Sequence, residues 1–170
     1  TKKSAGKMLV YDYYLEGNRK EEIIFNAHNC HPYQANDDIS GCSIAIQLFK
    51  YLSGIKNRQY SYRLIIAPEL FGPMFWAEKI MAKSQAIAGC VLLKSVGNHS
   101  TIKLQKSYSG SALIDQVLIK AIRDVTNAEV EEYSFRTCLK AFLFNLFEFK
   151  ITPSQSSIID LYFVKLYFLC

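Results

Sequence analysis

Short apolar segments alternate with helical segments along this chain, and this alternation most constrains its fold. Strands are expected over residues 8–15, 22–27, 62–67 and 86–96, with a short edge strand over 102–106. Helices are expected over 38–53, 72–83 and from residue 109 or 111 to 125. This order predicts an α/β fold, a three-layer sandwich around a mixed, mostly parallel sheet.

The third expected helix is amphipathic. Four apolar residues recur along it at helical spacing: Leu113, Val117, Ile122 and Val125. Because a surface helix turns its apolar stripe toward the core, we expect these residues on the buried face.

A polar cluster lies between the apolar run Ile23-Ile24-Phe25 and the helix that begins near Ser40. The cluster consists of His28, Cys30, His31, Asp37 and Asp38. Open α/β sheets bind ligands beyond the carboxyl ends of their strands, so the cluster is expected in such a crevice. Imidazole, thiolate and carboxylate are the groups that zinc selects. The sequence therefore predicts a metal site here.

The cluster residues have different expected roles. His28, at the strand tip, and Asp37 are the candidate metal ligands. Asp38 can cap the following helix, which leaves Asp37 free to ligate. Cys30 could be a ligand, a partner that orients His28 or a small buried residue, and we favour the orienting role. His31 is the weaker histidine; held extended before a proline, it could reach the metal or the substrate.

Glu69 repeats this strand-end placement, because it follows the strand expected over 62–67. A carboxylate there can be a metal ligand or the general base that deprotonates a metal-bound water. The alternative is an exposed loop acid. His99 lies in the turn sequence Gly97-Asn98-His99-Ser100 and is expected to be exposed.

Composition argues against several other classes of protein. The net charge is +5, but the basic residues are scattered and no aromatic-plus-basic motif accompanies them, which argues against nucleic-acid binding. No apolar stretch reaches the roughly 18–20 residues of a membrane span. The five cysteines form no CxxC pair and no apolar leader is present, which is typical of reduced thiols in the cytoplasm. We expect a cytoplasmic protein and leave its oligomeric state open.

The last third of the chain has a different pattern. Phenylalanines crowd the segment from Leu139 onward, and 158–170 is apolar to its end. This segment fits a buried terminal strand, a partner-binding surface, or truncated or out-of-frame sequence, and we favour the last. The expected division is a domain over 1–135 and an atypical tail over 136–170.

Three motifs carry a family resemblance over roughly 8–135: His28-x-Cys30-His31-Pro32, Ala35-Asn36-Asp37-Asp38-x-Ser40-Gly41 and Tyr62-Arg63-x5-Glu69-x2-Gly72. They resemble the aminopeptidase-like domain of bacterial proteins linked to polysaccharide biosynthesis. That group is similar to co-catalytic zinc aminopeptidases of the bacterial leucine aminopeptidase type. The resemblance implies a zinc-exopeptidase-like fold and one or two zinc ions.

The resemblance also implies roles for single residues. His28 would bind one zinc, Asp37 would bridge two, and Glu69 would match one of two glutamates that serve as base and ligand. The implied reaction is attack of a metal-activated hydroxide on an N-terminal peptide or related amide bond.

The sequence departs from the pattern of these peptidases at several positions. Cys30 stands where they have an aspartate, Pro68 stands where a second glutamate is expected, and no histidine follows His99. The resemblance therefore implies a metallopeptidase-type hydrolase with an incomplete ligand set, active or inactive. The alternatives are a non-catalytic binding module with a vestigial metal site in glycan or polysaccharide biosynthesis, and a truncated product.

Overall fold

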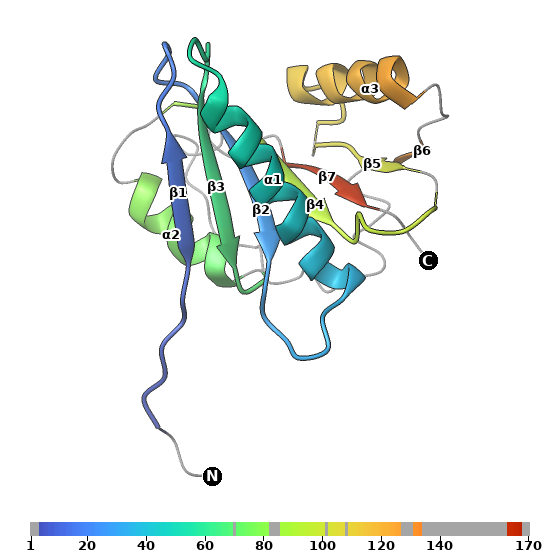
Figure 1. Cartoon of the computed structure of the whole chain (residues 1–170). Helices are drawn as coiled ribbons and strands as arrows, with labels where there is room; N and C mark the ends of the chain where they lie inside the picture. Colours follow the sequence, from blue (N-terminus) through green and yellow to red (C-terminus); the bar gives the residue numbers. More distant parts are fainter. Residues whose placement is uncertain are drawn as a thin grey trace.

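The computed structural model describes residues 4–69, 71–81, 86–100, 102–107, 109–126, 131–133 and 163–167 (Figure 1). Their strands form a single sheet in the order β1-β3-β2-β4-β7-β5-β6. The strands are β1 (Tyr11–Leu15), β2 (Glu22–His28), β3 (Ser61–Ala67), β4 (Ile87–Lys94), β5 (Lys103–Gln105), β6 (Glu131–Tyr133) and β7 (Phe163–Tyr167). The α-helices are α1 (Gly41–Gly54), α2 (Phe71–Met81) and α3 (Leu113–Thr126).

Most neighbouring strands run parallel. β2 is parallel to both β3 and β4, β4 is parallel to β7, and β5 is parallel to β6. The antiparallel pairs are β1 with β3 and β5 with β7. In the register of β2 and β3, His28 pairs with Ala67, so the carboxyl ends of the two strands meet at one edge of the sheet.

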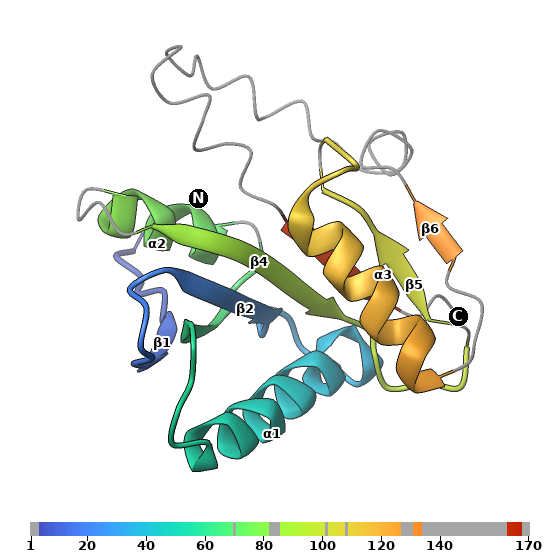
Figure 2. The same ribbon diagram turned by 90° about the horizontal axis from the view of Figure 1, so that it is seen from above.

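Helices cover both faces of the sheet, with α1 and α2 on opposite sides (Figure 2). On the α1 face, strand residues such as Leu64 and Val91 pack against Phe49. Ile114 and Leu118 of α3 pack against the same cluster. On the α2 face, the core cluster is Ile24, Ile65, Ala67 and Cys90, with Trp76 packed against it. Successive residues of a strand point to opposite faces, so each central strand supplies both cores. The predicted three-layer α/β fold is confirmed.

A buried ion pair joins the strands on the α2 face. Arg63 of β3 donates from Nε and Nη2 to the two carboxylate oxygens of Glu22, at 2.6 and 2.9 Å. Its Nη1 donates to Asp12 at 2.8 Å, and Trp76 Nε1 donates to the other oxygen of Asp12 at 2.7 Å. The hydrogen bond with Glu22 is the main cause that raises the pKa of Arg63 above its usual range. This network ties α2 to β1, β2 and β3.

Two sequence expectations differ from the structure. β5 lies between β7 and β6 and is therefore not an edge strand. On α3, Leu113, Val117 and Val125 are 71%, 51% and 83% exposed, while Ile114 and Leu118 face the core. The helix carries apolar residues on two faces, and only the position of the sheet decides which face is buried.

One strand of the sheet comes from the segment interpreted above as an atypical tail. Phe163–Tyr167 forms β7, which pairs with β4 on one side and β5 on the other. A terminal strand, one of the alternatives considered for this segment, is therefore present. Residues 134–162 and 168–170 lie outside the described residues, and the division at residue 135 stays a prediction.

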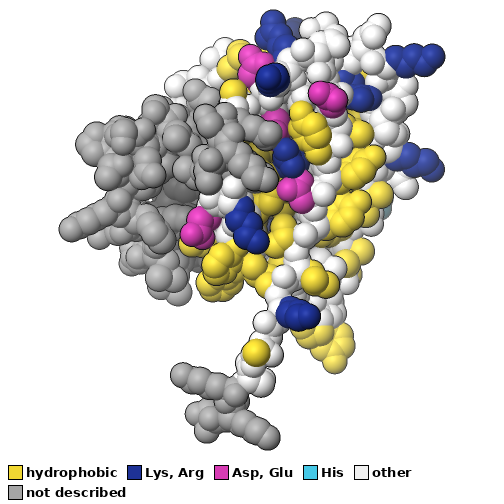
Figure 3. Space-filling model, turned by 90° about the vertical axis from the view of Figure 1, so that its left-hand side faces the viewer, with side chains coloured by type: hydrophobic (Ala, Val, Ile, Leu, Met, Phe, Trp, Pro, Cys, Tyr) yellow, Lys and Arg dark blue, Asp and Glu magenta, His cyan; other side chains and the backbone are white. Residues whose placement is uncertain are grey.

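Hydrophobic side chains cluster on the surface over β1 and α2, with charged side chains between them (Figure 3). Tyr11 and Tyr13 of β1 are 56% and 42% exposed, and Phe71 and Phe75 of α2 are 62% and 53% exposed. This edge of the sheet is therefore aromatic and open to solvent. None of the described helices has the length and apolar character to cross a membrane.

Candidate functional site

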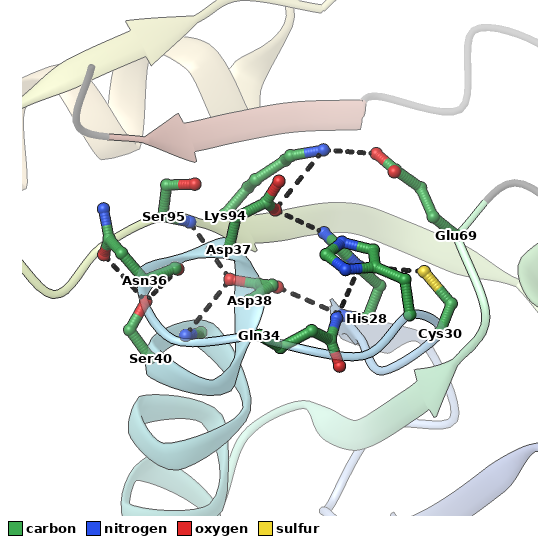
Figure 4. A network of polar contacts seen from close by, with 12 residues as sticks. His28, Cys30, Gln34, Asn36, Asp37, Asp38, Ser40, Glu69, Lys94 and Ser95 are labelled. Atoms are coloured by element: carbon green, nitrogen blue, oxygen red, sulfur yellow. Dashed lines mark hydrogen bonds and ion pairs between the residues drawn. The ribbon is translucent and has the colours of Figure 1, made fainter. Parts of the chain in front are cut away.

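The predicted site residues meet at the carboxyl ends of parallel strands (Figure 4). His28 is the last residue of β2, and Glu69 lies two residues beyond the end of β3. Asp37 and Asp38 lie in a short turn, Asn36–Ser40, that leads into α1. The peptide bond between these two aspartates is cis. The parallel arrangement of β2, β3 and β4 therefore brings together residues far apart in the sequence.

His28 is buried and has polar neighbours at both ring nitrogens. Its Nε2 lies 2.8 Å from Asp37 Oδ1, and its Nδ1 lies 3.4 Å from Cys30 Sγ and 3.5 Å from Gln34 Nε2. An ionised carboxylate only accepts hydrogen bonds, so the contact with Asp37 favours a proton on Nε2. Metal-binding histidines commonly donate their second N–H to a carboxylate in this way.

Cys30 lies on the Nδ1 side of His28, and the ring of His31 lies beside that of His28, with 6.1 Å between the ring centroids. The ligand atoms of His28, Cys30 and His31 all lie within 4.8 Å of one another, and within the described part of the chain this group could hold a metal ion. Both Cys30 and His31 are exposed. His31 Nδ1 lies 3.0 Å from the carbonyl oxygen of Pro32, so its Nε2 is the nitrogen left to act as a ligand.

Asp38 is fully buried and binds the backbone at three places. Its Oδ2 accepts from the N–H of His28 at 3.1 Å, and its Oδ1 accepts from the N–H groups of Gly41 at 3.1 Å and Ser95 at 3.0 Å. Desolvation raises the pKa of Asp38, and the backbone hydrogen bonds oppose this effect. The expected contact with the start of α1 is present, at Gly41. The same carboxylate also joins the ends of β2 and β4, so it holds the site together.

Lys94, the last residue of β4, is the site residue that the sequence reasoning missed. Its Nζ lies 2.5 Å from Glu69 Oε1 and 3.6 Å from Asp37 Oδ1. The Lys94 side chain is 17% exposed, against 33% for Glu69 and 49% for Asp37. A partial signal was available in the sequence, because Lys94 lies near the end of the strand expected over 86–96 and the carboxyl ends of parallel strands meet at one edge of a sheet.

The structure therefore gathers the predicted ligands around a lysine. His28 contacts Asp37 directly, whereas Glu69 is linked to Asp37 through the Lys94 ammonium group. His99 is exposed, as expected from its turn sequence.

Comparison with solved structures finds the same α/β fold in two other proteins. The crystal structure of a Clostridium acetobutylicum protein named a "putative peptidase" matches with a TM-score of 0.76 and 24% identity, over 95% of this chain and 36% of that chain. A glutaminyl cyclase from an Acidobacteriales bacterium matches with a TM-score of 0.62 and 18% identity, over 75% of this chain and 51% of that one.

The chain belongs to the family described as a domain of unknown function, DUF4910, whose model matches residues 2–140. It is also 31% identical over 117 residues to a C. acetobutylicum protein named "putative polysaccharide biosynthesis protein with aminopeptidase-like domain". That match covers 69% of this chain and 27% of the relative, so the chain spans about a quarter of the relative's length. The predicted family resemblance is confirmed.

Proposed function

We propose that this chain is a zinc-dependent, aminopeptidase-like hydrolase domain that acts on N-terminal peptide or related amide bonds. The observation that carries the proposal is the meeting of His28, Asp37 and Glu69 at the carboxyl ends of β2 and β3. The family membership and the peptidase-like fold support it. The peptide or amide substrate follows from the aminopeptidase-like domain in the name of the relative.

The donor set fits one zinc ion. A catalytic zinc site has three protein ligands of nitrogen, oxygen or sulfur and one open position. The ligand atoms of His28, Cys30 and His31 already lie close enough together to share an ion. His28, Asp37 and Glu69 offer a second set of suitable chemistry, in which Glu69 would have to exchange its contact with Lys94 for the ion. We propose that His28, Asp37 and Glu69 form the catalytic set. We propose that the exposed Cys30 and His31, together with His28, form an entry site that binds the ion first. Because both sets include His28, its removal is the sharpest test of metal binding.

A bound zinc ion would polarise the scissile carbonyl and lower the pKa of an attacking water molecule. The chain itself supplies orientation and proton transfer. In the metal-free chain Asp37 accepts the Nε2–H of His28 and so fixes the ring, and Nε2 would release this proton to bind an ion together with Asp37. In the metal-free chain Glu69 accepts a hydrogen bond from Lys94 on Oε1. With an ion on Oε1 in place of Lys94, its other oxygen would be the one to take a proton from water. Asp38 holds the backbone of His28 and Ser95 in place around these groups.

Zinc content measured by plasma mass spectrometry tests the proposal. We expect about one zinc per wild-type chain and almost none in His28→Ala, because every proposed ligand set needs this imidazole. His99→Ala is the matched control, since His99 is exposed and lies in a turn outside the site, and it should keep its zinc. Asp37→Asn and Cys30→Ala separate the two ligand sets.

Hydrolysis of aminoacyl p-nitroanilides by the same proteins tests the reaction. Activity that requires zinc and disappears in Glu69→Gln, but not in the exposed control Glu78→Gln, would support the hydrolase. Zinc that persists in His28→Ala, or no zinc after the metal is supplied, would remove the metal-dependent function. Zinc binding without hydrolysis would favour the non-catalytic binding module.

A further inference from the structure

The Lys94 ammonium group lies between the two carboxylates that the proposed function assigns to a metal ion. It is 2.5 Å from Glu69 Oε1 and 3.6 Å from Asp37 Oδ1, and Figure 4 shows the side chain pointing toward both residues. An ammonium group is a compact positive charge with three donors, so it can serve two carboxylates at once. The positive charge that neutralises Asp37 and Glu69 in this structure is therefore supplied by a side chain of the protein itself.

The position of Lys94 is built into the fold. Lys94 pairs with Tyr167 of β7, and β4 is also hydrogen-bonded to β2 on its other side. The next residue, Ser95, donates its N–H to the buried carboxylate of Asp38. The backbone at the base of the lysine is thus held by a strand and by the same aspartate that holds His28. A side chain that is only 17% exposed and fixed in this way differs from a loose surface ion pair.

We infer that Lys94 is a built-in competitor of the metal ion. Its ammonium group neutralises Asp37 and Glu69 in the metal-free protein and must move away before an ion can bind both. Zinc binds a carboxylate oxygen at about 2.1 Å, so an ion on Glu69 Oε1 would lie within about 5 Å of Nζ in its present position. Two cations so close repel each other, and this raises the Kd for zinc.

The inference deepens the proposed function, because it assumes that zinc and Lys94 share Asp37 and Glu69. It predicts that Lys94→Met binds zinc more tightly than the wild-type chain, by a factor on the order of 10–100, because the variant removes a like charge about 5 Å from the ion in a partly screened site. Methionine keeps most of the length and apolar character of the lysine stem and removes only the charge. Lys79→Met, at an exposed position of α2, is the matched control and should leave zinc affinity unchanged.

A second readout needs no metal. In the presence of a chelator, Lys94→Met leaves Asp37 and Glu69 without their cation, and we expect the midpoint of thermal unfolding to fall by roughly 2–5 °C. Adding Glu69→Gln to this variant should restore part of the loss, because it removes one of the two repelling charges. Lys79→Met should unfold at the wild-type temperature.

The zinc Kd is measured by competition with a fluorescent zinc chelator in wild type, Lys94→Met and Lys79→Met. Tighter binding in Lys94→Met alone, together with the fall in unfolding temperature, supports the inference. Equal or absent zinc binding in Lys94→Met, or no change in its unfolding temperature in chelator, overturns it. The proposed function fails in a different way, through wild-type zinc that does not depend on His28, or through zinc that binds only once Lys94 is replaced.

Discussion

Replacement of Asp38 tests whether one buried carboxylate holds the candidate site together. Its two oxygens accept three backbone N–H groups, from His28 at the end of β2, Gly41 at the start of α1 and Ser95 after β4. The first of these segments carries His28, the second begins α1 shortly after Asp37, and the third directly follows Lys94. The carboxylate itself has no exposed surface.

The expected loss of stability follows from the donors left behind. Asp38→Ala removes the acceptor of all three N–H groups, each of which costs about 1–3 kcal/mol when left without a partner. Part of this cost is returned because a carboxylate is no longer desolvated, and we expect a net loss of about 3–5 kcal/mol. In Asp38→Asn, the amide oxygen can take the place of Oδ1 and keep Gly41 and Ser95. Only the His28 N–H then faces an NH₂ group, and we expect a loss of about 1–3 kcal/mol.

Equilibrium unfolding in urea, followed by the fluorescence of Trp76, measures both variants. Trp76 is the only tryptophan of the chain and packs, partly buried, against the core on the α2 face. Asp124→Ala is the control, because Asp124 is exposed on α3 and pairs with Lys120 at the surface, so no measurable change is expected. An alanine variant no less stable than the asparagine variant would refute the reasoning. If Asp38→Ala does not fold, the loss in Asp38→Asn alone decides, and a loss near zero would refute it.

Three further predictions follow from other contacts. A Cβ at Gly41 would overlap the Asp38 carboxylate, so Gly41→Ala should lower the free energy of unfolding by about 1–3 kcal/mol. At Gly54 a Cβ meets open space, so Gly54→Ala should stay within about 1 kcal/mol of wild type. Equal losses in urea unfolding would contradict this. Arg63→Met leaves the buried Glu22 without its cation and should lower the free energy of unfolding by about 3–5 kcal/mol. The double variant Arg63→Met, Glu22→Met should lose less stability. A double variant as unstable as the single one would argue against a charge effect. Burial raises the pKa of Cys42 to about 11 and that of Cys90 to about 12, so both stay protonated at pH 8 and become reactive only as the pH approaches these values. Peptide mass spectrometry after iodoacetamide treatment of the native protein at pH 8 should find label on the exposed Cys30 and little on the other two, and equal labelling of all three would show that the core opens.

Much of the fold could be predicted from the sequence, because periodicity is a local property. The strand expected over 22–27 is Glu22–His28, and the strand expected over 62–67 is Ser61–Ala67. Apolar runs of this length, bounded by turn residues, indicate strands without reference to the rest of the chain. The meeting of His28 and Glu69 at one edge was also predictable, since the carboxyl ends of parallel strands lie together.

The sequence by itself determined the class of fold, the position of the polar cluster after β2 and the resemblance that the family match confirms. The tertiary structure alone decided that β7 lies between β4 and β5, that Ile114 rather than Val117 is turned to the core, and that Lys94 lies between Asp37 and Glu69. The contacts that define the site join residues far apart, 25 positions for Lys94 with Glu69 and 57 for Ser95 with Asp38. Local pattern sets which residues form a strand, but the partner of each side chain depends on the order and register of the strands, and these are set only when the whole sheet assembles.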